Sequence, residues 1–189
     1  MTKTPTRDEA WELVTSMTQS EQLRRHMRSV EAAMRAYARR FGEDEERWAV
    51  LGVIHDWDYE SGPTPELHPM RGIEMLREKG WPEDILDDIA SHADYLNVPR
   101  DSNIRKTLNA VDEMCGFIIA CALVKPDKSL SSVEPSTVRK KMKDKAFARG
   151  VHREELIAGA EALDIPFDEH VKNVRDALKP IAHELGLNP

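Results

Sequence analysis

The chain has 189 residues, and 40% of them are apolar, which is enough to build a packed core and excludes a wholly disordered protein. It carries 27 basic and 34 acidic side chains, for a net charge of −7 at pH 7. Because binding to a phosphate backbone needs a net basic face, we expect no nucleic-acid polymer as a partner.

The cysteines and the apolar runs indicate where the protein resides. Cys115 and Cys121 lie in one apolar stretch and cannot form a disulfide framework, so we predict buried thiols in a reducing compartment. Residues 1–21 lack the apolar region of a signal peptide. The longest uncharged run, 114–124, is 11 residues and too short to span a bilayer. We therefore expect a cytoplasmic protein with no membrane partner, and its oligomeric state is left open.

Three helices are predicted in the first part of the chain. Thr6, followed three residues later by Glu9, is typical of a capping box and begins a short helix. The second helix is indicated by apolar residues at three- and four-residue steps and ends at Gly42. Its apolar positions are Leu23, Met27, Val30, Met34, Tyr37 and Phe41. A third helix is predicted over about 44–56, because the Ser-Gly-Pro-Thr-Pro run at 61–65 cannot continue it.

The middle of the chain is predicted to continue with helices separated by proline and glycine. Pro69 is expected at the first position of a helix that Gly80 closes. Pro82 begins another helix, with Ile85, Ile89 and His92 on one stripe. A long apolar helix follows over 104–122, and a loop is predicted over 125–135.

The last part of the chain contains a basic block at 139–149, followed by two predicted helices over 153–163 and 168–185. Pro180 should kink or divide the last helix, because proline cannot donate the backbone hydrogen bond there. Alternating β-branched runs are absent from the sequence. We therefore predict an all-α fold.

Six polar side chains lie in or beside the predicted apolar stripes. Burial of an aspartate without a partner is costly, so such a residue should be paired or bound to a metal. Imidazole nitrogens and carboxylate oxygens are usual ligands of divalent transition metals. A single histidine on an apolar face is more often a packed core residue, so both interpretations stay open at this point. The six residues are His26, His55, Asp56, His68, His92 and Asp112.

The order of these residues resembles the H…HD…D signature of the HD-domain superfamily of metal-dependent phosphohydrolases. His26, the His55-Asp56 doublet and Asp112 match that signature, and His68 and His92 match the extra ligands of its two-metal members. The resemblance covers about residues 20–125. It implies a helical HD bundle over 20–125, preceded by an N-terminal helix over 1–19 and followed by a helical extension over 126–189 packed on it.

The resemblance also implies which residues bind metal. His26, His55, Asp56 and Asp112 would hold one divalent ion, and Asp56 would bridge to a second ion held by His68 and His92. The metal could be Mn, Fe, Mg or Zn, with one or two ions per chain, because nitrogen and oxygen ligands do not select among them. Two such ions clamp the attacking and leaving oxygens in phosphoryl transfer and acidify bound water.

One departure from the family pattern concerns the residues after the doublet. Many relatives have small residues and a lysine there, whereas this chain has Trp57-Asp58-Tyr59-Glu60. We therefore expect the segment to supply an acid. Asp58 and Asp94 are the candidate carboxylates for orienting a catalytic water, with a surface or supporting role as the alternative. Tyr59 and Tyr95 could line the pocket.

A phosphate ester needs positive charge near it, and the basic block offers it. Lys140, Lys141 and Lys143 could form a lid that brings cations to the substrate phosphates, or the block could simply be a solvated face. Arg105 and Lys125, which flank the helix of Asp112, are rival phosphate contacts. The histidines beyond the matched region, His152, His170 and His183, are predicted to lie at the surface.

The predicted function is hydrolysis of a small phosphorylated substrate, an ester or anhydride such as a nucleotide, by metal-activated water. Two alternatives remain. The same ligand set resembles that of HD-type di-iron oxygenases, and a non-catalytic HD module could bind a nucleotide without turnover.

Overall fold

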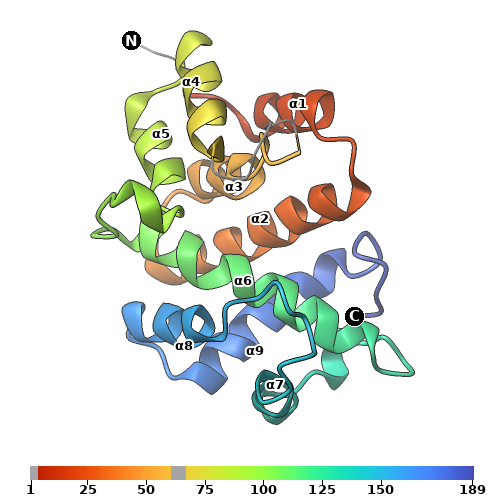
Figure 1. The fold of residues 1–189 in the computed structure, drawn as a ribbon. Helices are drawn as coiled ribbons and strands as arrows, with labels where there is room; N and C mark the ends of the chain where they lie inside the picture. Colours follow the sequence, from red (N-terminus) through yellow and green to blue (C-terminus); the bar gives the residue numbers. More distant parts are fainter. Residues whose placement is uncertain (1–3, 61–66) are drawn as a thin grey trace. The chain divides into compact units, whose positions relative to one another are not determined.

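The computed structural model describes residues 4–60 and 67–189 and divides the chain into two compact units, 1–108 and 109–189. Figure 1 labels the helices. The all-α prediction is confirmed, since no β-strand occurs in the described part of the chain and a single-residue bridge joins Ser129 and Asn188. None of the described helices is both long and apolar enough to cross a membrane.

The first unit contains five α-helices and the beginning of a sixth among its described residues. These are α1 (Arg7–Met17), α2 (Glu21–Phe41), α3 (Glu45–Ile54), α4 (Met70–Glu78), α5 (Glu83–Ala90), the 3-10 turn η2 (Asp94–Leu96) and the start of α6 (Asn103–Leu123). The second unit contains the rest of α6, η3 (Leu130–Ser132), α7 (Pro135–Met142), α8 (Arg153–Ala162), α9 (Phe167–Leu178) and η4 (Lys179–Ile181). The boundary between the units falls inside α6, and the predicted 20–125 domain stays a prediction.

The helix ends follow the local chemistry of the sequence. The capping box of Thr6 and Glu9 is formed at the start of α1, as predicted. Gly42 ends α2 with a φ of 68°, in the left-handed region that glycine adopts at little cost. Pro69 precedes the first helical residue of α4 rather than occupying it. Pro180 lies in a 3-10 turn after α9, so the predicted division of the last helix is confirmed.

The basic block departs from a single helix. It includes the end of α7 at Met142, and the residues after it form turns up to the start of α8. Arg139 is tied to α9, because its side chain donates to Asp168 at 2.8 Å and lies over the ring of Phe167 at 4.7 Å. The ammonium group of Lys141 lies 4.5 Å from the centre of the Phe147 ring.

Helix α3 is buried from Trp48 to Ile54 and packs against α1 and α2. The helices approach closely at Gly52, where a Cβ atom would lie only 2.7 Å from the Cα of Glu31 on α2. Any larger residue at 52 would have to push the two helices apart. This close packing positions the end of α3 beside α2, which matters because both helices carry predicted metal ligands.

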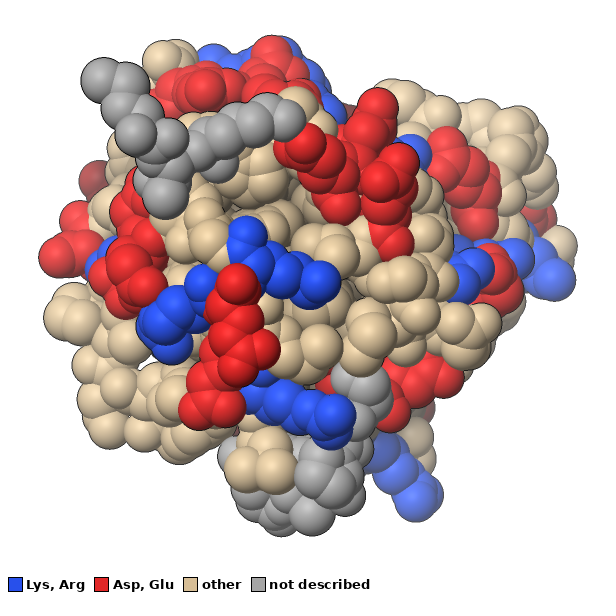
Figure 2. Space-filling view, turned by 90° about the horizontal axis from the view of Figure 1, so that it is seen from above, with Lys and Arg blue, Asp and Glu red and all other residues tan. Residues whose placement is uncertain are grey.

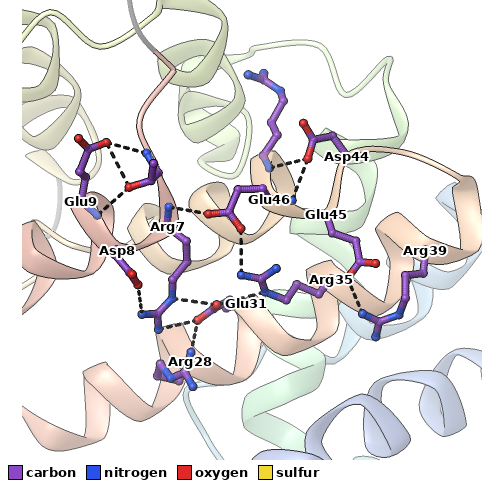
Figure 3. Close-up of polar contacts among 12 residues, drawn as sticks. Arg7, Asp8, Glu9, Arg28, Glu31, Arg35, Arg39, Asp44, Glu45 and Glu46 are labelled. Carbon is purple, nitrogen blue, oxygen red and sulfur yellow. Dashed lines mark hydrogen bonds and ion pairs between the residues drawn. The ribbon is translucent and has the colours of Figure 1, made fainter.

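A buried carboxylate joins α1 to the α2–α3 pair. Glu31 has a side-chain exposure of 4% and accepts hydrogen bonds from Arg7 at 3.0 and 3.1 Å, from Arg28 and from Arg35 at 3.3 Å. Figure 3 shows these arginines directed at Glu31, with Glu46 of α3 bound to the backbone N–H of Arg7 at 2.9 Å. A buried charge is tolerated where several donors satisfy it.

Acidic and basic side chains are interspersed on the face that carries α1, α4 and α5 (Figure 2). Ion pairs such as that of Arg77 on α4 with Glu83 on α5, at 2.8 Å, form between neighbouring helices of the first unit. These two side chains are 48% and 62% exposed, so solvent screens the pair and it adds little stability.

The second unit holds a histidine that the sequence analysis placed at the surface. That prediction was wrong for His170, which is fully buried, whereas His152 and His183 are exposed. His170 Nε2 lies 3.0 Å from the carbonyl oxygen of Ala110 on α6, and this carbonyl accepts its N–H. Burial lowers the pKa of His170 to about 4, although the carbonyl of Ala110 acts in the opposite direction. The polar neighbours of His170 in the sequence led to the wrong prediction, because His170 lies on the buried face of α9 with Val174 and Leu178.

We expect Glu31→Gln to lower the free energy of unfolding by about 2–3 kcal/mol, because the change removes a buried charge that three arginines surround. Urea denaturation measures this difference. The control is Glu46→Gln, at a side chain that is 54% exposed, and it should cost less than about 1 kcal/mol. Equal losses in the two variants would show that Glu31 does not hold α1 in place.

We expect His170 to make stability depend on pH. Its folded pKa lies below the ordinary 6.5, so its contribution is complete above pH 6.5 and is lost as the pH falls toward 4. Relative to His170→Gln, the wild-type protein should lose about 2–3 kcal/mol of unfolding free energy between pH 7 and pH 4.5. Denaturant titrations at both pH values measure this. A constant gap between the two proteins would contradict the buried neutral state.

Candidate metal centre

Five of the six predicted metal ligands lie in the first unit, at the ends or on the faces of its helices. His26 lies on α2, His55 is the C-terminal cap of α3 and Asp56 follows it directly. His68 comes just before α4, and His92 follows the end of α5. Residues from four separate helical segments are therefore candidates for one site.

Asp56 is the residue around which the four histidines gather. Its Oδ1 lies 3.0 Å from Nε2 of His68 and 3.4 Å from Nε2 of His92. Its Oδ2 lies 3.6 Å from Nε2 of His26 and 3.5 Å from Nε2 of His55. Each carboxylate oxygen thus faces a different pair of imidazoles, which is the arrangement expected of a carboxylate that bridges two cations.

The imidazoles of two histidines are oriented by the backbone. Nδ1 of His55 lies 2.9 Å from the carbonyl oxygen of Gly52, and Nδ1 of His92 lies 2.5 Å from that of Ile89. A carbonyl oxygen can only accept, so each Nδ1 carries the proton and Nε2 carries the lone pair. In both residues the lone pair therefore lies on the nitrogen that faces Asp56, as a metal ligand requires.

His68 is oriented by side chains instead. Its Nδ1 lies 2.7 Å from Oδ1 of Asp58, and the hydroxyl of Tyr95 donates to its carbonyl oxygen at 2.8 Å. The ring of Tyr59 lies against the His68 ring with centroids 5.2 Å apart. The two tyrosines are half exposed, so they lie at the rim of the candidate centre.

The segment after the doublet is tied to the beginning of α2. Thr18 Oγ1 donates to the carbonyl oxygen of Trp57 at 3.0 Å. The carboxylate of Glu60 accepts the backbone N–H groups of Gln19 at 2.6 Å and Ser20 at 2.9 Å. These contacts hold the start of the helix that carries His26 against the chain that carries Asp56.

The electrostatics of the cluster favour an ionised Asp56. Burial by itself would raise the pKa of this carboxyl, but His55, then His68, His92 and His26, hold it well below its ordinary value. For His68, burial lowers the pKa, but Asp56 and Asp58 outweigh it and raise the pKa to about 9. His68 is therefore charged at pH 7 in the absence of a metal, and a divalent cation would take the place of its proton. An anionic carboxylate and imidazole lone pairs form a donor set that suits such a cation.

The donor atoms also meet a geometric test for metal binding. One donor atom from each of Asp56, His68 and His92 lies within 4.8 Å of the others. The residues of this group therefore fit a bound divalent metal. Asp112 lies on α6 in the second unit, and its part as a ligand stays a prediction.

The structure places the two candidate catalytic carboxylates in different surroundings. Asp58 is buried, and besides His68 it accepts the backbone N–H of Gly72 at 2.8 Å. Asp94 has a side-chain exposure of 72% and pairs with Arg100 at 2.5 Å. The sequence analysis did not predict a role for Gly72, although a glycine inside a predicted helix is a signal of close packing.

The candidate phosphate contacts lie in both units. Arg105 is bound to Asp88 at 2.7 Å and to Asp101 at 3.6 Å in the first unit. Lys125 donates to the carbonyl oxygen of Ser132 in the second unit. The lysines of the basic block are also in the second unit, where Lys140 and Lys141 lie on α7 and Lys143 is its C-terminal cap.

We expect Asp56→Ala to abolish binding of divalent metal, because it removes the oxygens that face all four histidines. His92→Ala should remove one of two ions, because it leaves the His26 and His55 side of the carboxylate intact. Elemental mass spectrometry on untagged protein measures ions per chain, and circular dichroism verifies that both variants are helical. Full metal content in Asp56→Ala would contradict this assignment of the centre.

Comparison with known protein families agrees with the geometry of this centre. The family model for the HD domain matches residues 23–122, which is more than half of the chain and includes all six predicted ligands. No curated protein and no solved structure matches the chain. Because the family model covers most of the first unit and the histidine–aspartate residues on which the resemblance rests, the chain belongs to the HD domain family.

Proposed function

We propose that this protein is a metal-dependent phosphohydrolase that cleaves a phosphate ester or anhydride of a small molecule, with nucleotides as the first candidates. The HD family is made up mostly of metal-dependent hydrolases. The observation that carries the proposal is the position of Asp56, whose two oxygens face two different pairs of histidine Nε2 atoms.

In this proposal, Asp56 would be shared by two cations. His68 and His92 would hold one of them, and His26 and His55 would hold the other, to which the family resemblance of the sequence adds Asp112. When bound, the two ions would acidify a water molecule and neutralise charge on the phosphate oxygens. The role of the chain is to present lone pairs in a fixed geometry, and the Nδ1 contacts to backbone carbonyls support this for His55 and His92.

The surroundings of the centre support a site that a small molecule can reach. Trp57 and His55 are buried, whereas Tyr59 and Tyr95 are 50% and 52% exposed beside His68. Aromatic rings at a rim can pack against the organic part of a substrate, which then places its phosphate next to Asp56.

The proposal also needs cationic side chains that bind the phosphate of the substrate. Arg105 and Lys125 are engaged with Asp88 and with Ser132, which argues against their release to bind a phosphate. Lys140, Lys141 and Lys143 stay the preferred candidates, since Lys140 and Lys143 are exposed and lie close together in the chain.

Hydrolysis is tested with metal-free protein reconstituted separately with Mn²⁺, Fe²⁺, Mg²⁺ or Zn²⁺ and offered a panel of nucleotides and sugar phosphates. We expect phosphate release by the wild-type protein with at least one ion, and none by Asp56→Ala, because that variant lacks the bridging oxygens. Glu46→Gln, an exposed change on α3, is the matched control and should retain the activity.

Two outcomes would contradict the proposal, and each identifies an alternative. Consumption of oxygen by the iron-loaded protein without phosphate release would indicate an oxygenase, because the same nitrogen and oxygen ligands can hold iron. Binding of metal and nucleotide without any turnover across the panel would indicate a binding module.

A further inference from the structure

We infer that Asp58 is a positioning residue that holds the proton of His68 on Nδ1, so that Nε2 of His68 is available to a metal ion. Gly72 is the residue that makes this position of Asp58 possible. The inference rests on the metal centre of the proposed function and adds a role that the ligand pattern of the sequence does not assign.

The carboxylate of Asp58 is held between two donors inside the protein. It is 1% exposed, its Oδ1 lies 2.7 Å from Nδ1 of His68, and its Oδ2 accepts the N–H of Gly72 at 2.8 Å. An ionised carboxylate can only accept hydrogen bonds, so the nitrogen of His68 that faces Asp58 must carry a proton.

The other nitrogen of the same ring faces the metal centre. Nε2 of His68 lies 3.0 Å from Oδ1 of Asp56 and 3.0 Å from Nε2 of His92. A neutral imidazole has one N–H group, so a proton held on Nδ1 leaves the lone pair on Nε2. Asp58 therefore does for His68 what the carbonyl oxygens of Gly52 and Ile89 do for His55 and His92.

Gly72 explains how a carboxylate fits at this position. A Cβ atom at residue 72 would lie 2.7 Å from Cγ of Asp58 and 2.6 Å from Nε1 of Trp57. Both distances are too short for real side chains, and both neighbours are buried, so a larger residue would displace the carboxylate. A glycine inside α4 thus supplies an N–H donor and the space beside it.

This geometry argues against Asp58 as the carboxylate that orients a catalytic water. Both of its oxygens are engaged, and its partners hold it on the side of His68 opposite to Asp56. Asp58 would affect the reaction only by orienting the metal ligand His68. It is therefore a positioning residue and not a catalytic one.

The test uses Asp58→Asn, which has nearly the same shape and a single acceptor oxygen. If that oxygen accepts the N–H of Gly72, the amide NH₂ group faces Nδ1 of His68 and forces the ring proton onto Nε2. We expect the affinity for one of two Co²⁺ ions to fall about 10- to 100-fold while the affinity for the other is unchanged. Titration of metal-free protein with Co²⁺, followed by visible absorption, measures both.

Two further variants separate orientation of His68 from general stability. Gly72→Ala should reproduce the selective loss, since it displaces the same carboxylate without changing its chemistry. Glu31→Gln also neutralises a buried carboxylate, but its partners are arginines and not a metal ligand, so it should lower stability without a selective loss of affinity for one of the two Co²⁺ ions. If the role of Asp58 were purely structural, Asp58→Asn would lower the affinities for both Co²⁺ ions together or leave both unchanged.

A measurement on the wild-type protein does not depend on any variant folding. In ¹⁵N-labelled protein loaded with Zn²⁺, long-range ¹H–¹⁵N spectra should show His68 protonated at Nδ1 and metal-bound at Nε2. A proton on Nε2, or equal Co²⁺ affinities in wild type and Asp58→Asn, would overturn the inference and leave the proposed function standing. A wild-type protein that binds no metal would overturn both.

Discussion

Four helical segments of the first unit meet at one largely buried charged side chain, Asp56, which is 14% exposed. Water is largely excluded from this carboxylate, which would normally favour its neutral form, and four imidazoles compensate by holding it ionised. Such a cluster stabilises the fold only when its histidines arrive from the correct directions. Every helix that carries one of them is therefore constrained by the same carboxylate, and a divalent cation would satisfy the same negative charge.

Other contacts of the first unit hold together the helices that carry these histidines. Close approach at Gly52 and the arginines around Glu31 hold α1, α2 and α3 as one layer (Figure 3). The tie from Glu60 to the start of α2 joins the carrier of His26 to the segment after Asp56. Because the donors lie within a few ångströms of Asp56, small shifts of any of these helices would matter for binding of metal.

The chemistry proposed for this site follows from the same arrangement. Family membership supplies the class of reaction, and the two-sided position of Asp56 supplies the reason to favour two ions over one. Asp58 and Gly72 support the ligands from outside the metal centre. The Nδ1 atom of His68 contacts the side chain of Asp58, whereas those of His55 and His92 contact backbone carbonyls.

The sequence by itself determined the all-α class, most helix ends and the identity of the six candidate ligands, because helical periodicity, capping and ligand order are local or linear properties. Only the tertiary structure decided that each oxygen of Asp56 faces two histidines, that Asp58 points at His68, and that His170 is buried. These facts depend on which helix faces pack together. Two carboxylates two residues beyond a ligand, Asp58 and Asp94, look equivalent in the sequence, yet one is enclosed beside Gly72 and the other is exposed to solvent. Only tertiary packing brings residues that are far apart in the chain close together and excludes water from them. These two effects make Asp58 a supporting residue and leave Asp94 at the surface.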